Sequence, residues 1–152
     1  MEKIACLNKK AYHEYEIIET YEAGVSLLGT EVKSLRNGNT DLKDSFARVE
    51  EGEIFVYNWH ISPYRFGNQF NHPPKRRKKL LLTRREINRL YGKVKEKGLS
   101  IIPLKVYFKK GKAKLEISLA KGKKVRDIRE ELKRREAVRE MKKAIKDWKL
   151  GR

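Results

Sequence analysis

The chain has 152 residues, of which 38 are Lys or Arg and 20 are Asp or Glu, so its formal net charge is +18 and its isoelectric point is about 10.0. It has one cysteine, Cys6, and no apolar run near the roughly 18 residues of a membrane span, which excludes a disulfide scaffold, a thiolate zinc cluster and a membrane protein. Residues 1–6 do not resemble a secretory signal, so we expect a reducing cytosolic compartment, and the excess of cations favours a polyanionic partner.

One strand and two helices are predicted in chain order. Aromatic and β-branched residues favour a strand at 12–18. A short helix is predicted at 30–36, where an Asn-Gly pair follows it. A second helix begins after Thr83, because Thr83 and Glu86 form the capping-box pattern ahead of an apolar stripe that Gly98 ends.

Two hairpins are also predicted, because each pair of strands flanks a dipeptide that ends in glycine. In the last strand, charged residues alternate with apolar ones, so one face of the strand points to the core and the other to solvent or a ligand. The hairpins join 45–50 to 53–58 around Glu51-Gly52, and 104–109 to 112–119 around Lys110-Gly111.

Short strands, tight turns and few helices in about 120 residues indicate a mainly β protein, a small closed or nearly closed antiparallel barrel. The charge distribution divides the chain into a body at 1–120 and a basic tail at 121–152. The tail holds fourteen basic and six acidic residues, and thus +8 of the net +18. Its apolar residues recur at helical spacing, so we expect a helix that forms on an anionic partner. These residues are Ile128, Leu132, Val138, Met141, Ile145 and Trp148, with Arg135 interrupting the stripe.

Signals of catalysis are weak. The histidines His13, His60 and His72 lack the i, i+4 spacing of a helical zinc pair, and no nucleophile elbow, dinucleotide fingerprint or P-loop is present. His13 and His60 leave open an acid–base pair for RNA cleavage, but histidines that stack or hydrogen-bond fit the sequence better. We therefore expect a protein that is not an enzyme and that uses no metal or cofactor.

Signals of nucleic-acid binding are stronger. Residues 75–79 are five consecutive cations, and Arg84 and Arg85 follow them. Three lysines surround Gly122, whose missing side chain lets the backbone approach phosphate. Exposed aromatic rings ahead of the first run would stack on unpaired bases, which favours RNA over duplex DNA. The lysines are Lys121, Lys123 and Lys124, and the rings are Tyr57, Trp59, Tyr64, Phe66 and Phe70.

An ordered set of motifs closely resembles the SmpB family of SsrA-binding proteins. The resemblance covers the chain from about Leu7 to the early tail, and its specificity comes from the order and spacing of the motifs. They are Tyr21-Glu22-Ala23-Gly24, residues 29–36, Asn71-His72, residues 79–82, Glu86-Ile87 and residues 120–124.

The resemblance implies a bacterial, cytoplasmic RNA-binding factor with an oligonucleotide-binding-type (OB-type) barrel, two or three packed helices and a basic tail that is helical when bound. Its partner is the tRNA-like domain of transfer-messenger RNA (tmRNA), which it delivers to stalled ribosomes in trans-translation. The body stands in for an anticodon arm, and the tail enters the vacant mRNA channel beside the decoding-site rRNA. Elongation factor Tu and alanyl-tRNA synthetase are implied only through the RNA, and we expect a monomer with no membrane partner.

The resemblance also indicates RNA-contacting residues in the body. An amide or ammonium can donate to phosphate or sugar, and the histidine can stack or donate. Glu22 can accept a hydrogen bond from a base edge or a 2′-OH, or it can orient a neighbouring cation. Leu81 could equally belong to the core. The residues are Asn8, His13, Glu22, Lys79, Leu81 and Lys114, to which the Gly122 element adds Lys121, Lys123 and Lys124.

In the tail, the resemblance indicates ribosome contacts but is less regular. Ile128 stands where the family has a cation. Arg126, just before Asp127, supplies a cation instead, so the number of positive charges in this segment is kept. The expected ribosome-contacting residues are Arg126, Asp127, Arg129, Ala144, Ile145 and Trp148.

Composition alone leaves an alternative open. A ribosomal or ribosome-assembly protein that binds rRNA also needs a basic barrel with an arm. The ordered motifs favour the tmRNA-binding interpretation.

Overall fold

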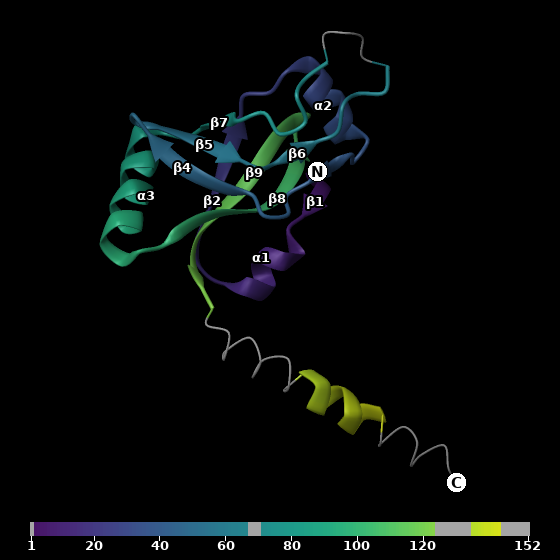
Figure 1. Ribbon diagram of the computed structural model, residues 1–152, viewed down its shortest axis with the longest axis vertical. Helices are drawn as coiled ribbons and strands as arrows, with labels where there is room; N and C mark the ends of the chain where they lie inside the picture. The colour runs from purple at the N-terminus through teal and green to yellow at the C-terminus, as the bar shows by residue number, and fades with distance from the viewer. Residues whose placement is uncertain (1, 67–70, 124–134, 144–152) are drawn as a thin grey trace. The chain divides into compact units, whose positions relative to one another are not determined.

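The computed structural model describes residues 2–66, 71–123 and 135–143 (Figure 1). The chain divides into two compact units, Met1–Gly122 and Lys123–Arg152. In the second unit, residues 135–143 form a helix whose residues are all exposed, including Val138 and Met141. The first unit reaches Gly122, two residues beyond the body expected from the sequence, because its last strand continues through Lys121.

The first unit contains nine strands and three helices in the described part of the chain. The strands are β1 (Glu2–Leu7), β2 (Tyr15–Val25), β3 (Thr40–Asp41), β4 (Phe46–Glu50), β5 (Glu53–Tyr57), β6 (His60–Ile61), β7 (Lys78–Leu81), β8 (Ser100–Lys109) and β9 (Lys112–Gly122). The helices are α1 (Lys9–Glu14), α2 (Gly29–Arg36) and α3 (Arg84–Lys97).

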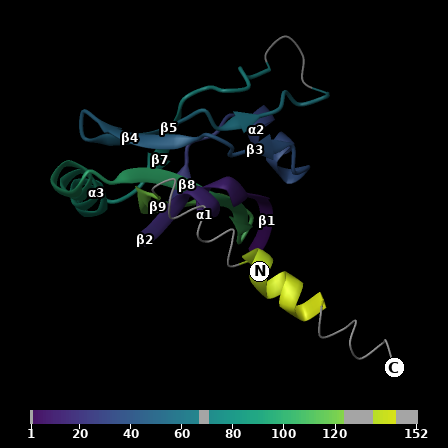
Figure 2. The ribbon, with the colours of Figure 1, turned by 60° about the horizontal axis from the view of Figure 1, so that its bottom comes forward.

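Six antiparallel strands form a closed ring, which confirms the predicted barrel. The seven-stranded sheet has the order β1-β8-β4-β5-β7-β2-β9, and β9 pairs again with β8, so β1 is the strand of this sheet that lies outside the ring, and β3 and β6 form a separate two-stranded sheet. Two seams of the ring are short. β4 meets β8 through Ala47 and Ile101, and β2 meets β7 through Gly24–Leu81 and Val25–Leu80. Helices α2 and α3 lie at opposite ends of the barrel (Figure 1 and Figure 2).

Both predicted hairpins are present with the expected turns. The φ angles are 51° and 78° at Glu51 and Gly52, and 52° and 75° at Lys110 and Gly111. Two consecutive positive φ angles define the type I′ turn, whose twist matches that of the flanking strands.

The strand predicted at 12–18 is partly wrong. Residues 9–14 form α1, and β2 begins at Tyr15. Asn8 caps α1, since its side-chain oxygen accepts a hydrogen bond from the Ala11 amide. This cap and the burial of Ala11 override the β propensity of Tyr12 and its neighbours.

The other two helices agree with the sequence. Thr83 and Glu86 form the capping box of α3, and Gly98 ends the helix with a φ of 62°. Helix α2 begins one residue earlier than expected, at Gly29, and Glu31 accepts a hydrogen bond from the Leu28 amide.

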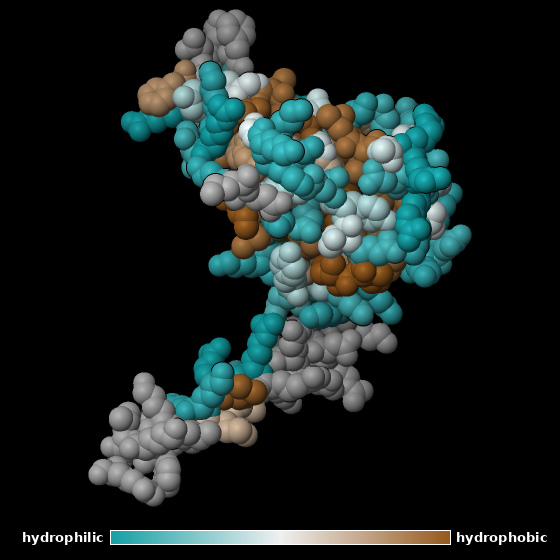
Figure 3. Space-filling model, turned by 180° about the vertical axis from the view of Figure 1, so that it is seen from behind, coloured by the Kyte–Doolittle hydropathy of each residue, from teal (hydrophilic) through white to brown (hydrophobic). Residues whose placement is uncertain are grey.

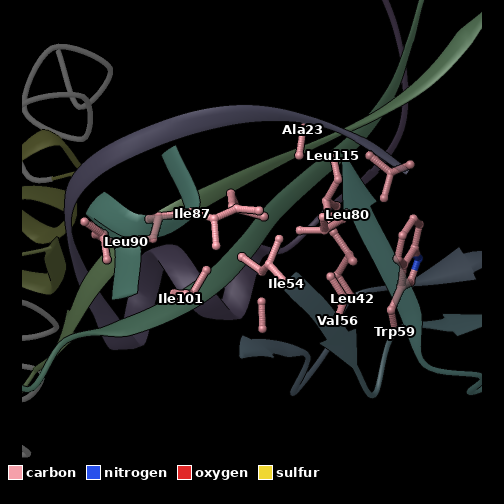
Figure 4. Close-up of a cluster of buried hydrophobic side chains, with 14 of the residues drawn as sticks. Ala23, Leu42, Ile54, Val56, Trp59, Leu80, Ile87, Leu90, Ile101 and Leu115 are labelled. Atoms are coloured by element: carbon pink, nitrogen blue, oxygen red, sulfur yellow. The ribbon is translucent and has the colours of Figure 1, made fainter. Parts of the chain in front are cut away.

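The barrel encloses the main hydrophobic core (Figure 4). Trp59 is fully buried there and its indole donates to Thr40 Oγ1 at 2.7 Å, so it belongs to the core and offers no stacking surface for a base. A second cluster fills the space beneath α1. Its buried members are Ala11, Ile102, Leu104 and Ala120.

A buried ionic cluster ties α2 to β7. The Glu31 side chain is fully buried and accepts hydrogen bonds from Arg76 at 2.7 and 3.3 Å. The Lys78 side chain is also fully buried, with its Nζ 4.0 Å from Glu31. That Nζ donates to the carbonyl oxygens of Trp59 and Arg76 at 2.8 and 2.7 Å. Burial lowers the pKa of Lys78 to about 8, against the opposing effect of Glu31, so the side chain remains mostly charged at pH 7.

Replacing Glu31 with Gln is expected to lower the free energy of unfolding by about 3 kcal/mol, because it leaves the cations of the cluster uncompensated. The control is Glu53→Gln, which breaks an exposed pair with Lys79 and should cost at most about 1 kcal/mol. Urea unfolding of both variants measures the difference.

The pH dependence of the Glu31→Gln deficit has a defined sign. The pKa of Lys78 in the folded protein lies below its ordinary value of 10.5. Between these two pKa values the unfolded chain binds more protons than the folded one, so the contribution of Lys78 to the free energy of unfolding rises with pH. The variant lacks the carboxylate that favours charged Lys78, so its deficit should shrink as pH rises from 7 past 8. A deficit that grows with pH would contradict the assignment.

Candidate nucleic-acid interface

The outer surface of β2, β9 and β8 forms a charged face, called here the β2–β9–β8 face. The strand registers pair Glu22 with Glu116, Glu116 with Lys105, and Lys114 with Tyr107. Facing partners in a sheet point to the same side, and the alternating neighbours of these residues point into the core. The face is made of Glu22, Lys105, Lys109, Lys112, Lys114 and Glu116, and these residues surround Tyr107, which is only 3% exposed.

Glu22 is held as an ionised hydrogen-bond acceptor on this face. Its Oε2 accepts from the Tyr107 hydroxyl at 2.5 Å and lies 3.4 Å from Lys109 Nζ. The Tyr107 hydrogen bond and then the Lys109 ammonium lower the pKa of Glu22. The structure thus pairs Glu22 with a neighbouring cation, one of the roles expected for it from the sequence.

The two carboxylates of the face lie opposite each other, which alone would be repulsive. Lys109 compensates Glu22, and Lys105 compensates Glu116 at 3.7 Å. Lys114 lies close enough to Glu22 to lower the pKa of that carboxylate. Phosphate groups would therefore meet lysines held by short-range charge pairs on a rigid sheet.

Asn8 has a structural role that the sequence analysis did not predict. Its side chain is 4% exposed, and its Nδ2 donates to the Pro103 carbonyl at 2.8 Å while its Oδ1 caps α1. Both polar groups are occupied inside the protein, so the expected direct contact with phosphate or sugar does not fit this geometry. Asn8 instead positions α1, which carries the partly exposed His13 in its last turn.

The five consecutive cations at 75–79 do not form a continuous exposed patch. Lys78 is buried, and Arg76 bonds to Glu31. Arg77 pairs with Glu50 at 3.2 Å and covers the Phe55 ring at 4.0 Å. Strand alternation and these internal pairs separate the five charges. In the run, Lys79 stays accessible, and its exposed pair with Glu53 at 2.8 Å is weak enough to exchange for a phosphate.

Leu81 is a surface residue, with 54% of its area exposed, so the alternative of a core leucine is wrong. It lies opposite Gly24 in the short β2–β7 seam. A Cβ atom at Gly24 would lie 3.3 Å from the Leu81 Cβ, so the glycine provides the room for this close approach.

The lysines around Gly122 and the tail are only partly described. Lys121 is exposed at the end of β9, and Lys123 is half-buried. The predicted contacts Lys124, Arg126, Asp127, Arg129, Ala144, Ile145 and Trp148 lie outside the described residues.

The histidines occupy different surroundings. His72 is buried, with Nδ1 2.8 Å from Thr30 Oγ1 and Nε2 2.8 Å from the Ile61 carbonyl, which fixes it as a structural residue. His13 lies in α1. His60 lies in β6, where it lines a hollow of about 500 Å³ together with Asp41 and Lys75.

Lys105, Tyr107 and Lys109 were not predicted from the sequence. Their alternation with the apolar Val106 and Phe108 is the same signal that identified the charged side of β9. Applying that signal to β8 would have found the partners of Glu22. Seen from behind, the molecule presents hydrophilic side chains with apolar patches between them (Figure 3). Within the described part of the chain, no helix is long and apolar enough to cross a bilayer.

A closed antiparallel barrel with a lysine-bearing outer face defines a small basic β-barrel protein of the nucleic-acid-binding class. The family model described as SmpB protein matches residues 5–147. The chain belongs to the SmpB family.

Similar proteins are named SsrA-binding protein. The one from Carboxydothermus hydrogenoformans is 60% identical over 146 residues, which cover 96% of this chain and 98% of that protein. The one from Pelotomaculum thermopropionicum is 61% identical over 145 residues, 95% of each chain. A chain in the solved structure "tmRNA-SmpB: a journey to the center of the bacterial ribosome" matches with a TM-score of 0.67 and 53% identity, over 79% of this chain and 85% of that one.

Replacing Asn8 with Ala should destabilise the fold by about 1–3 kcal/mol, because it removes the α1 cap and leaves the buried Pro103 carbonyl without its donor. Asn88→Ala on the exposed side of α3 is the matched control and should change stability by less than about 0.5 kcal/mol. Urea unfolding followed by circular dichroism measures both, and equal effects would contradict the role given to Asn8.

Proposed function

We propose that this chain binds transfer-messenger RNA and acts with it at the ribosome in trans-translation, as a binding factor and not as an enzyme. The observation that carries the proposal is identity of about 60% with SsrA-binding proteins along almost the whole chain. The solved tmRNA-SmpB chain supports the same partner and the bacterial ribosome as the place of action. Such a role corresponds to a cytoplasmic location in a bacterium.

The β2–β9–β8 face supports recognition of a folded RNA through its backbone. Lys114 and Lys105 offer charge to phosphates, and Glu22 offers a fixed acceptor to a 2′-OH or a base edge. The Glu22 carboxylate cannot bind a phosphate, because both are negatively charged. It therefore adds selectivity among RNAs, while the lysines add affinity. His13, Lys79, Leu81 and Lys121 complete the proposed contact set of the described body, and Asn8 acts through α1.

The tail supplies a second, separate part of the proposal. With +8 in 32 residues, it is suited to rRNA of the decoding site and to the vacant mRNA channel. Val138 and Met141 are exposed and three residues apart, so they lie on the same side of the helix at 135–143. We propose that this side is covered when the tail binds the ribosome.

Replacing Lys114 with Gln should weaken tmRNA binding and lower the slope of log Kd against log salt by about one unit, because one phosphate contact is lost. The same change is expected for Lys79→Gln. Lys97→Gln, at the exposed end of α3, is the control and should leave the slope unchanged. Gel shifts at several salt concentrations give the slopes.

The same gel shifts test the choice of RNA. At one salt concentration, tmRNA should bind more tightly than an ordinary tRNA or an rRNA fragment. Equal affinity for all three would overturn the proposed function and favour a general rRNA-binding protein. Cleavage of any labelled RNA by the pure protein would instead favour the ribonuclease alternative.

Ending the chain after Lys124 should leave the thermal midpoint and the tmRNA affinity nearly unchanged while abolishing the tagging of stalled chains. The reason is that Met1–Gly122 is a compact unit with its own core. Calorimetry, gel shifts and a reconstituted tagging assay measure the three quantities. A truncated chain that fails to fold, or one that still tags, would contradict the division of roles.

A further inference from the structure

A second candidate binding surface lies away from the β2–β9–β8 face, where α3 meets β4 and β8. A hollow of about 430 Å³ opens there. Its existence follows from the short seam of the barrel, since β4 and β8 pair only through Ala47 and Ile101 and diverge on either side. The lining residues that matter for binding are Tyr15, Phe46, Arg48, Tyr91 and Ser100, and the rest of the lining is aliphatic.

Two aromatic walls border the hollow, and a cation lies over each. Phe46 stacks on Tyr57 with ring centroids 5.4 Å apart and planes 16° from parallel. The Arg48 guanidinium lies 5.3 Å from the Phe46 ring centroid. On the α3 side, Tyr91 is 43% exposed, and Lys95 Nζ lies 4.8 Å from its ring centroid.

The charge of the hollow is one-sided. Among the described residues that line it, Arg48 is the sole charged one, and none is a carboxylate. The hydroxyl groups of Tyr15, Tyr91 and Ser100 are the polar side-chain groups of the remaining described lining. The hollow therefore suits a ligand that combines flat faces, hydrogen-bonding edges and a nearby negative charge.

We propose that this hollow binds an unpaired base of an RNA strand, at a site separate from the β2–β9–β8 face. Nucleobases stack on aromatic rings and on guanidinium planes, and the adjoining phosphates would meet Arg48 and Lys95. A stacked duplex does not present a free base face to such a hollow. An apolar side chain of a partner protein would fill it without using either cation. The inference rests on the proposed function only in taking RNA as the ligand.

The test uses the full chain and a uridine trinucleotide with 2-aminopurine at its centre, because the fluorescence of 2-aminopurine falls when it stacks. The wild-type chain should quench the probe in a saturable way. Tyr91→Leu keeps apolar volume but removes the ring, so it should weaken binding by about tenfold, while Tyr91→Phe should retain it. Arg48→Gln, at an exposed position, should also weaken binding without affecting folding.

Tyr12→Leu is the matched control, because Tyr12 is similarly exposed, at 47%, but lies on α1 outside the hollow. It should quench like the wild type. Absence of saturable quenching, equal loss in Tyr12→Leu, or full binding by Tyr91→Leu and Arg48→Gln would each overturn the inference. The last result would mean that the base stacks at another place on the chain.

The failure of this inference can be distinguished from failure of the proposed function. In gel shifts with the isolated tRNA-like domain of tmRNA, Tyr91→Leu should bind as the wild type does and Lys114→Gln should not. Loss of quenching with intact tmRNA binding overturns only the hollow. Quenching by a chain that does not prefer tmRNA overturns only the proposed function.

Discussion

The structure depends on one buried carboxylate. Glu31 lies in α2, far along the chain from β7, and its bonds to Arg76 and proximity to Lys78 fix where that strand joins the barrel. Lys78 in turn reaches the Trp59 carbonyl, which connects the cluster to the segment between β5 and β6. A charge without its partner in such a place is costly, so each member of the cluster requires the others. The closing strands of the barrel are therefore positioned by electrostatics as well as by hydrophobic packing.

This constraint separates the cations that stabilise the fold from those available to a ligand. At the start of β7, Lys78 points inward, while Arg77, just before the strand, and Lys79 meet carboxylates of the neighbouring hairpin. On β8 and β9 the balance differs, because the outward lysines outnumber Glu22 and Glu116. A net charge of +18 thus indicates a polyanionic partner but does not locate its surface.

Features set by local signals were predictable from the sequence. Both hairpins depend on a glycine at a positive φ angle, and α3 depends on a capping box of four residues, Thr83 to Glu86, so short windows sufficed. The errors came from long-range partners. Asn8 turns the following residues into a helix and is itself held by the Pro103 carbonyl, 95 residues away. The role of Lys78 depends on a carboxylate from another element, which no run of five cations reveals. Glu22 was indicated by its motif, but Tyr107 and Lys109, which orient it, required the register of β8 against β9.

The two short seams of the barrel lie beside the surfaces proposed for RNA. A closed ring of strands must stagger and tilt, and full pairing along every strand boundary would leave an even outer wall. Here β2 and β7 meet at Gly24 and Leu81, beside the motif that carries Glu22, and β4 and β8 part around the aromatic hollow. Sparse pairing exposes a leucine at one seam and aromatic rings at the other, while the long β2–β9 and β8–β9 ladders keep the rest rigid. Each surface proposed for RNA thus borders a gap in strand pairing and is supported by a long ladder.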